Sequence, residues 1–188
     1  MYARLGKRLL DILMAGSALV LLSPLLALTG GLIRIEDGPP VIYRQKRPGR
    51  NGQPFTILKF RSMPDDAPEA PSASMGTAQV TRVGRVIRRL NVDELPQLFN
   101  ILRGDMSLVG PRPPLNSQED LIDLRRVGGA YLLRPGLTGL AQVNAYDGMT
   151  AEAKAHLDNL YAKQVTFRSD LDIIARTVLF LFRPPPTY

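Results

Sequence analysis

Cysteine and tryptophan are absent from this sequence, and its 188 residues include a single histidine, His156. Without cysteine there are no disulfides, thiolate nucleophiles or cysteine-based zinc sites, which suits a reducing compartment. One histidine excludes a metal site built from several histidines, and it leaves one possible base for a serine–histidine–aspartate arrangement. We interpret His156 as an ordinary surface or core residue. In an enzyme of this composition, carboxylates, arginines and lysines must perform most of the chemistry.

Acidic residues are few relative to basic ones. The chain has 24 Lys and Arg against 17 Asp and Glu, and its formal net charge is +7. We therefore expect anionic partners, such as nucleic acid, lipid headgroups or phosphorylated small molecules. The length and the 45% hydrophobic content fit one compact domain with a core.

Charge is missing altogether from residues 12–33, an apolar run long enough to cross a bilayer as a helix. No small-residue cleavage site is evident after it, which argues against a secretory signal. Basic residues flank the run on both sides. Because positive flanks tend to stay cytoplasmic, a single crossing would break this tendency at one end.

The dipeptide Ser23-Pro24 interrupts this run. Pro24 has no N–H to donate to the carbonyl of Val20 and its ring clashes with the preceding turn, so the helix should bend. The Ser23 hydroxyl can donate to a freed carbonyl and lower the cost in lipid. These features favour a re-entrant helix, which enters one leaflet and returns to the same side, over a spanning helix. Nearby, Asp11 is expected to pair with Lys7 one turn earlier.

The rest of the chain predicts an α+β, mainly helical fold that includes amphipathic interfacial helices and a small β-hairpin. Residues 41–45 and 55–61 are the candidate strands, with Pro48-Gly49 and Asn51-Gly52 supplying the turn. Residues 64–77 are rich in proline, alanine, serine and acids, and this composition predicts a mobile loop.

Four further helices are predicted at residues 82–90, 93–102, 151–164 and 171–182. The first is basic and amphipathic, typical of a membrane-surface helix or an anion-binding wall, and its apolar stripe is Val83, Val86, Ile87 and Leu90. The stripe of the second is Leu95, Leu98, Phe99 and Leu102. Asn91 is placed to cap this second helix, and Glu94 has capping-box spacing from it.

Asp93 and Glu94 are adjacent carboxylates at this predicted helix start. Acids in a first turn are stabilised by the helix dipole by about 0.3–1 kcal/mol, so a structural role is one reading. The other reading is chemistry, because Arg88, Arg103 and Arg112 are close in sequence and a carboxylate among arginines stays ionised and can act as a nucleophile. A neighbouring carboxylate can bind Mg²⁺ or transfer a proton. Such a set suits phosphoryl transfer.

Three motifs are specific enough to indicate a family: KFRSM at residues 59–63, DELPQLFNILRGDMSLVGPRP at 93–113 and RPGLTGLAQV at 134–143. Together with the apolar N-terminus and its Ser-Pro break, they closely resemble the bacterial sugar transferase family, the monotopic phosphoglycosyl transferases. The resemblance covers nearly the whole chain. The chain resembles the small members of the family, which lack the additional transmembrane helices of the larger members.

The resemblance implies a transferase that moves a sugar 1-phosphate from a UDP-sugar to polyprenyl (undecaprenyl) phosphate and releases UMP at the cytoplasmic face of the bacterial inner membrane. By the motif match, Asp93 forms a covalent phosphosugar intermediate in a ping-pong mechanism, and Glu94 is its dyad partner. Mg²⁺, with Asp93 and Glu94 as ligands, neutralises the diphosphate. The resemblance also implies a monotopic protein, with a re-entrant membrane segment at residues 1–36 and a catalytic domain at 37–188.

Motif match and charge together indicate six substrate-binding residues: Lys59, Arg61, Arg88, Arg112, Arg134 and Gln142. An arginine fork binds two phosphate oxygens, although pairing on the surface for stability is the alternative for each of these basic residues. Gly136 and Gly139 are interpreted as turn residues that bring backbone close to ligand or core. One departure concerns sugar recognition. Many members have Gly-Arg after QVN, whereas Ala145 and Tyr146 stand here, so that arginine's contact cannot be carried over.

Two other function classes fit parts of the sequence. The net charge suits a membrane-anchored basic adaptor or a nucleic-acid binder, but aromatic residues make up only 6% of the chain and no nucleic-acid motif is present. We therefore expect no nucleic-acid partner. In an inert membrane scaffold, Asp93 and Glu94 would only start a helix.

Overall fold

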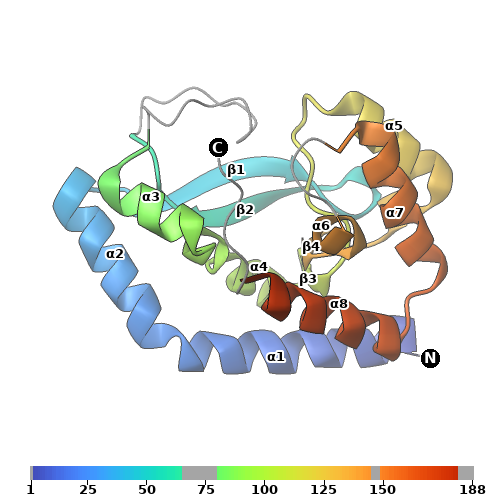
Figure 1. Ribbon diagram of the computed structural model, residues 1–188, viewed down its shortest axis with the longest axis horizontal. Helices are drawn as coiled ribbons and strands as arrows, with labels where there is room; N and C mark the ends of the chain where they lie inside the picture. The colour runs from blue at the N-terminus through green and yellow to red at the C-terminus, as the bar shows by residue number, and fades with distance from the viewer. Residues whose placement is uncertain (1, 65–79, 145–148, 182–188) are drawn as a thin grey trace.

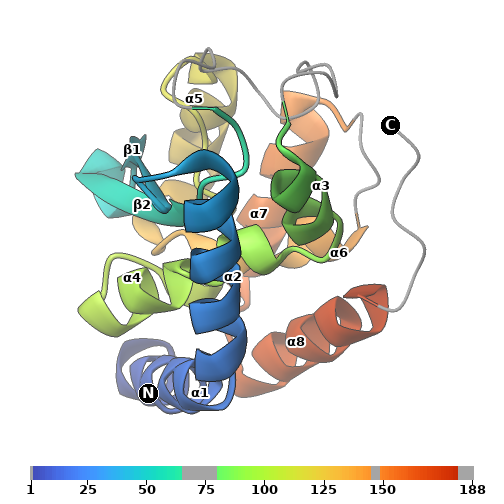
Figure 2. The ribbon, with the colours of Figure 1, turned by 90° about the vertical axis from the view of Figure 1, so that its left-hand side faces the viewer.

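The computed structural model describes residues 2–64, 80–144 and 149–181 of the chain. A long β-hairpin runs across the middle of the molecule, α1 and α8 lie along one side, and α5 and α7 pack together at one end (Figures 1 and 2). The predicted loop at residues 64–77 lies almost entirely outside the described residues. The predicted mainly helical fold with a small hairpin is confirmed.

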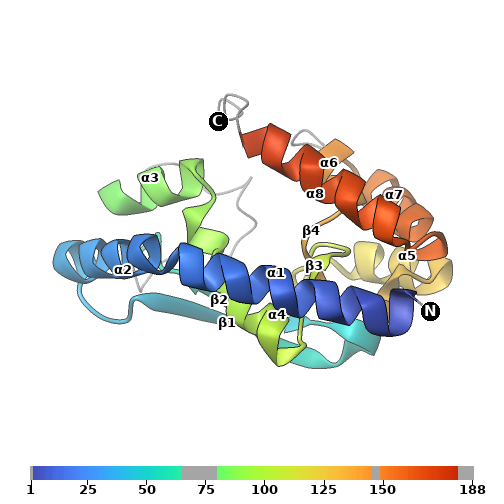
Figure 3. The same ribbon diagram turned by 90° about the horizontal axis from the view of Figure 1, so that it is seen from below.

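The apolar N-terminus forms two helices that meet at a sharp bend. After a π-helical turn (Tyr2–Gly6), α1 (Lys7–Leu21) and α2 (Ser23–Asp37) are bent by 62°. The Ser23 hydroxyl donates to the Val20 carbonyl at 2.8 Å, so the predicted break at Ser23-Pro24 is confirmed together with its hydrogen bond. In the described part of the chain, no single helix has the length and apolarity to cross a membrane, whereas α1 and α2 pass that test as a bent pair. Figure 1 shows the bend, and Figure 3 shows the two helices from below.

The predicted hairpin is present; its first strand is longer than expected, and its second strand has the expected length but starts one residue earlier. Strand β1 (Ile42–Pro48) pairs antiparallel with β2 (Pro54–Phe60), and a short 3₁₀ turn (Arg50–Gly52) connects them. The outer edge of β2 is covered by the fully buried Asn100, which donates to the carbonyl of Thr56 at 2.8 Å and accepts from the N–H of Leu58 at 3.0 Å. These bonds satisfy buried backbone groups and fix β2 beside α4.

The region around the two carboxylates differs from its prediction. Helix α3 (Arg82–Arg89) is followed by the 3₁₀ turn η5 (Val92–Glu94) and then by α4 (Gln97–Arg103). The predicted cap is wrong, since Asn91 has a left-handed backbone (φ 54°) and makes no side-chain capping bond. The carboxylates therefore precede α4 and do not belong to its first turn. Nor is either predicted stripe wholly buried, because Val86 and Phe99 are 57% and 48% exposed.

The C-terminal half contains elements that no sequence pattern predicted. Strands β3 (Ser107–Val109) and β4 (Gly136–Thr138) pair in parallel and contact α8, and this half also contains α5 (Glu119–Gly128), η6 (Ala130–Leu132) and α6 (Leu140–Asn144). Helix α7 (Ala151–Lys163) matches its prediction, whereas α8 (Phe167–Leu181) begins earlier than expected. Gly136 and Gly139 do allow close backbone approach, because an added Cβ on either would lie 2.1 Å from backbone atoms of Gly110.

Three clusters of buried apolar residues join these elements. The first connects α1, β2 and α4 through Ala15, Ile57, Leu98, Ile101 and Met106. The second connects α2, β2, α3 and η5 through Ile33, Phe60, Ile87 and Val92. The third connects β3, α7 and α8 through Val109, Tyr161 and Ile173.

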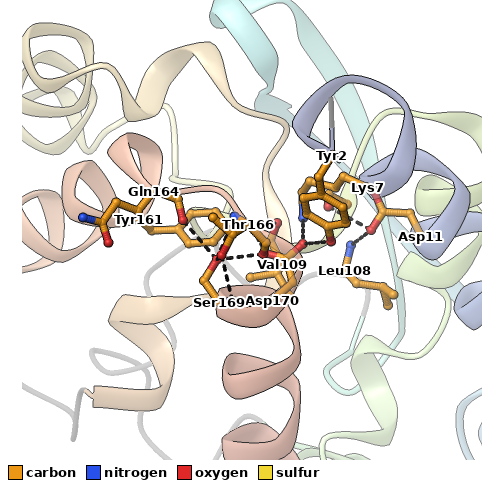
Figure 4. A network of polar contacts seen from close by, with 11 residues as sticks. Tyr2, Lys7, Asp11, Leu108, Val109, Tyr161, Gln164, Thr166, Ser169 and Asp170 are labelled. Carbon is orange, nitrogen blue, oxygen red and sulfur yellow. Dashed lines mark hydrogen bonds and ion pairs between the residues drawn. The ribbon is translucent and has the colours of Figure 1, made fainter.

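A buried carboxylate in α8 anchors the start of α1 (Figure 4). Asp170 is fully buried and accepts hydrogen bonds from the hydroxyls of Tyr2 (2.6 Å) and Tyr161 (2.5 Å) and from the ammonium of Lys7 (2.7 Å). The predicted Lys7–Asp11 ion pair is therefore replaced by Lys7–Asp170. Lys7 pairs with the distant Asp170 because that carboxylate is buried and accepts two hydroxyl donors, and a cation compensates its negative charge there.

Two more polar residues of α1 point toward the body of the protein. Asp11 is 1% exposed and accepts from the Ser107 hydroxyl at 3.0 Å and from the Leu108 N–H at 2.9 Å, both in β3. Arg8 donates to the carbonyls of Ile101 (2.6 Å) and Leu102 (2.8 Å) at the C-terminal end of α4. A cation at this end complements the helix dipole and occupies carbonyls that have no intrahelical partner.

We expect Asp170→Asn to lower the free energy of unfolding by about 3–5 kcal/mol, since it leaves the Lys7 ammonium without its buried partner. Denaturant titration of the purified protein in one fixed detergent measures this change. Asp172→Asn, in the same helix, is the matched control: its carboxylate is 62% exposed and lies 3.7 Å from Arg176, so its loss should cost less than about 0.5 kcal/mol. Equal losses in the two variants would contradict the anchoring role.

Candidate active site

Asp93 and Glu94 lie in η5, between α3 and α4, and the fold brings cations from three other elements to them. Lys59 comes from β2, Arg88 from α3, and Arg112 from the segment that follows β3. Val92 at the start of η5 is buried in the second apolar cluster, and Pro96 directly precedes α4. The carboxylates are thus held between a buried anchor and a helix start.

Glu94 takes the direct bonds of two of these cations. Its Oε1 accepts from the Lys59 ammonium at 2.8 Å, and the Arg112 guanidinium bonds both carboxylate oxygens, with Nη1 3.2 Å from Oε2. Burial by itself would raise the pKa of Glu94, but Arg112 and Lys59 outweigh it and hold the pKa well below its usual range. Glu94 is therefore a fixed anion at neutral pH.

Asp93 is in the opposite electrostatic position. Burial, and next the negative charge of Glu94, raise its pKa from 3.8 to about 6, against the lowering effect of Lys59, Arg88 and Arg112. The sequence predicted that arginines keep this carboxylate ionised, whereas in the structure two of the three cations bond directly to its neighbour. At pH 7 Asp93 is still mostly ionised, and its oxygens are more basic than those of an ordinary aspartate, which favours nucleophilic attack.

Arg88 and Arg61 are both fixed by protein contacts. The Nε of Arg88 donates to the Ser62 hydroxyl at 2.8 Å, beside the carboxylates. Arg61 is 5% exposed, pairs with the Asp37 carboxylate at 2.9 Å and donates to the carbonyls of Asp37 and Gly38. The contacts of Arg61 thus hold the end of α2 against β2, and its predicted phosphate contact stays a prediction.

Arg134 and Gln142 each bond to a backbone carbonyl of another segment. Arg134 donates to the Gly104 carbonyl at 2.9 Å, at the end of α4 opposite to Asp93. Gln142 donates to the Leu137 carbonyl at 3.0 Å, and its Oε1 is buried with no hydrogen-bond partner among the described residues. Arg134 thus lies at the far end of α4 from the two carboxylates, and among the described residues no hydrogen bond or ion pair joins Gln142 to them. The substrate contacts of both residues stay predictions.

The sequence did not indicate two residues that bond to the basic residues of the site. Ser62 orients Arg88, and Arg125 in α5 donates to the backbone carbonyl of Arg112 at 2.9 Å. Ser62 lies within the KFRSM motif, so a position next to Arg61 was a usable signal. Arg125 lies in an unremarkable charged helix, and nothing in its sequence context indicated burial.

The donor set fits a divalent cation only in part. Among the described residues, no group of three or more acidic or histidine side chains could hold a metal ion. Mg²⁺, however, is usually bound by one or two carboxylates together with phosphate oxygens and water. Asp93 and Glu94 can supply this share, although both Glu94 oxygens already accept from Arg112, so Asp93 is the more available ligand.

Comparison with known proteins places this geometry in a family. Residues 2–184 match the family model described as bacterial sugar transferase. The chain is 42% identical, over 98% of its length and 72% of the other protein, to a UDP-glucose:undecaprenyl-phosphate glucose-1-phosphate transferase of Caulobacter vibrioides. It is 40% identical to the uncharacterized sugar transferase EpsL of Bacillus subtilis, over 92% of this chain and 85% of that one.

A third relative is longer. The chain is 42% identical to a UDP-N-acetylgalactosamine-undecaprenyl-phosphate N-acetylgalactosaminephosphotransferase of Aeromonas hydrophila, over 92% of this chain but 42% of the relative. The shared part of that protein therefore corresponds to nearly the whole chain described above.

We expect Asp93→Asn to stabilise the protein at pH 7.5. A folded-state pKa raised from 3.8 to about 6 means that the wild type loses stability as pH rises from about 4 to 6, and the variant does not. The gain should be about 1–3 kcal/mol at pH 7.5 and should shrink toward zero near pH 4. Denaturant unfolding at both pH values, with a chelator present, measures it.

Glu94→Gln is the matched control for this prediction and should change stability in the opposite direction at pH 7.5. The folded-state pKa of Glu94 is depressed, so its ion pairs contribute stability that is present above its unfolded pKa and lost as pH falls below it. Changes of the same sign in the two variants at pH 7.5 would show that the two carboxylates do not differ in this way.

Proposed function

The chain belongs to the bacterial sugar transferase family, and from that premise we propose that it transfers a sugar 1-phosphate from a UDP-sugar to undecaprenyl phosphate. The relatives from Caulobacter vibrioides and Aeromonas hydrophila carry a UDP-sugar and undecaprenyl phosphate in their names. The observation that carries the proposal is the pair of adjacent carboxylates with opposite pKa shifts, surrounded by Lys59, Arg88 and Arg112. Such a pair offers a basic nucleophile beside a permanent anion with attached cations.

In the first step, a carboxylate oxygen of Asp93 attacks the phosphorus that bears the sugar. An acyl phosphate bond to Asp93 forms, the bond from that phosphorus to the bridging oxygen breaks, and UMP leaves with the bridging oxygen. Lys59, Arg88 and Arg112 offset the repulsion between the carboxylate and the incoming diphosphate. Charge neutralisation and positioning supply most of the catalysis in this class of reaction.

In the second step, an oxygen of undecaprenyl phosphate attacks the same phosphorus. The bond to Asp93 breaks, undecaprenyl-diphosphate sugar leaves, and the carboxylate is regenerated. Mg²⁺, when bound with Asp93 and Glu94 as protein ligands, would neutralise part of the diphosphate charge. The low pKa of Glu94 keeps Lys59 and Arg112 paired beside the reacting group throughout both steps.

The sugar is the variable part of this reaction. The relatives named above act on UDP-glucose in one case and on UDP-N-acetylgalactosamine in the other. Ala145 and Tyr146, which replace the usual Gly-Arg, lie outside the described residues. The assay below therefore uses a panel of UDP-sugars.

We also propose that α1 and α2 form a re-entrant segment on the cytoplasmic face of the inner membrane. Their 62° bend, the basic flanks and the outward apolar side chains support this topology. Exposed apolar residues on these helices and on α8 include Leu9, Leu13, Leu28, Leu32, Leu171 and Leu179. An exposed apolar surface of this extent indicates contact with lipid. A lipid-borne acceptor phosphate would then meet the catalytic carboxylate at the membrane surface.

The ping-pong scheme predicts a covalent intermediate without any lipid acceptor. Incubation of the protein with a panel of UDP-sugars and Mg²⁺ should yield UMP and a mass increase of one sugar phosphate on the peptide that contains Asp93, detected by mass spectrometry. Asp93→Asn should lose both signals, with a turnover loss of at least about 10³-fold. Asp105→Asn, which keeps the dyad, is the control. UMP that appears only in the presence of acceptor would contradict the scheme.

The re-entrant topology predicts that both flanks of the bent pair lie on one side of the membrane. Because the chain has no cysteine, Ala3→Cys and Arg44→Cys introduce single labelling sites at exposed positions before α1 and after α2. A membrane-impermeant thiol reagent should label both in inverted inner-membrane vesicles and neither in intact spheroplasts. Labelling of the two sites from opposite sides would establish a spanning segment instead.

A further inference from the structure

We propose that Arg125 and Asp158 are positioning residues that hold Arg112 in place for catalysis, and this inference rests on the proposed function. Arg125 lies in α5 and Asp158 in α7, two helices that pack side by side (Figure 1). Asp158 holds Arg125, and Arg125 bonds to the backbone carbonyl of Arg112. The side chain of Arg112 in turn binds Glu94.

The first part of this support is a buried ion pair. Arg125 and Asp158 are 5% and 1% exposed. The Nε and Nη2 of Arg125 donate to one carboxylate oxygen of Asp158, at 2.9 and 2.6 Å. A pair so deeply buried costs desolvation energy, and apolar residues of similar volume often serve stability equally well. Stability alone is therefore a weak reason for a charged pair at this position.

The second part is the remaining donor of the guanidinium. The Nη1 of Arg125 donates to the backbone carbonyl of Arg112 at 2.9 Å. Arginine has a rigid planar fork, so two nitrogens on Asp158 fix the direction of the third. A lysine at this position has no such fork and cannot impose the same direction.

The third part is the stiffness of the segment that carries Arg112. Buried prolines, Pro111 and Pro113, flank it, and the Gly136 N–H donates to the Pro111 carbonyl at 2.9 Å. The Arg112 side chain is half-exposed, so few neighbouring side chains restrict it. The position of its backbone therefore sets which groups its guanidinium can reach. The Arg125 bond fixes the next carbonyl of that backbone and completes a continuous chain of contacts from Asp158 to Glu94.

Two neighbouring bonds keep α5 and α7 in register for this task. Asn159, next to Asp158, donates to the Leu124 carbonyl at 3.1 Å and accepts from the Ala130 N–H at 3.1 Å. The side chain of Asn159 thus joins α7 both to α5 and to the turn after α5. Of the polar residues between these helices described above, Arg125 also bonds to the segment that carries Arg112.

The double variant Arg125→Met/Asp158→Leu tests this inference, because it replaces the ion pair by apolar side chains of similar size. Single-turnover UMP release with the active UDP-sugar should slow by about tenfold to a hundredfold, as expected for a small displacement of a catalytic group, while the denaturation midpoint stays near that of the wild type. Arg126→Met is the matched control: this neighbouring arginine is 59% exposed, pairs with Asp123 and should leave the rate unchanged.

A thermodynamic cycle separates positioning from a general structural effect. In an Arg112→Gln background, the double variant should cause no further loss of rate, because the side chain that Arg125 positions is already missing. An equal loss in both backgrounds, or full activity of the double variant in the wild-type background, overturns the inference. If the double variant does not fold, Arg125→Lys, which retains a cation beside Asp158, takes its place with the same expected pattern.

The wild-type protein in the same assay distinguishes failure of this inference from failure of the proposed function. A wild type that releases no UMP with any UDP-sugar contradicts the proposed reaction, and the inference falls with it. A wild type that is active, combined with additive losses in the cycle, overturns only the positioning role.

Discussion

The carboxylate of Glu94 is the point at which three distant parts of the chain meet. Lys59 reaches it from the hairpin, Arg112 from the proline-rich segment after β3, and Glu94 itself lies in the turn between α3 and α4. Two cations on one buried carboxylate lower its pKa and keep it charged. Its charge then acts on Asp93 one residue away, so the state of the proposed nucleophile depends on an interaction in which it takes no direct part. Without either cation, Glu94 would be a buried charge without full compensation.

The two carboxylates relate to stability in opposite ways. Glu94 is more acidic in the folded protein than in the unfolded chain, and its ion pairs stabilise the fold at neutral pH, whereas Asp93 is less acidic and its charge destabilises it. A destabilised charge is typical of a reacting group, because the same burial that disfavours the anion leaves it poorly solvated and reactive. The neighbouring ion pairs, the Asn100 bonds to β2 and the buried Val92 keep such a group in place.

The first helix combines two surfaces with different partners. Lys7, Arg8 and Asp11 bond to α8, α4 and β3, and the leucines on the other side are exposed. In the proposed re-entrant topology the outer face of α1 lies in lipid and has no aqueous driving force, so the polar contacts on its protein side would fix its position. These contacts place the bend at Ser23 in a defined relation to the site, which matters if a substrate arrives from the membrane.

Local patterns in the sequence determined several features: the bend at Ser23-Pro24, the hairpin, the position of α7 and the family. Each depends on neighbouring residues or on a contiguous motif, for which chain connectivity already fixes the geometry. The tertiary structure alone decided that Lys7 pairs with Asp170 and not with Asp11, that Asn91 does not cap, and that Lys59 and Arg112 bond to Glu94. It also decided the parallel pair β3–β4 and the burial of Arg61 and Arg125. The physical reason is that a buried charge selects its partner by desolvation and by the geometry of the finished fold. Partners far apart in sequence leave no periodic signal to read.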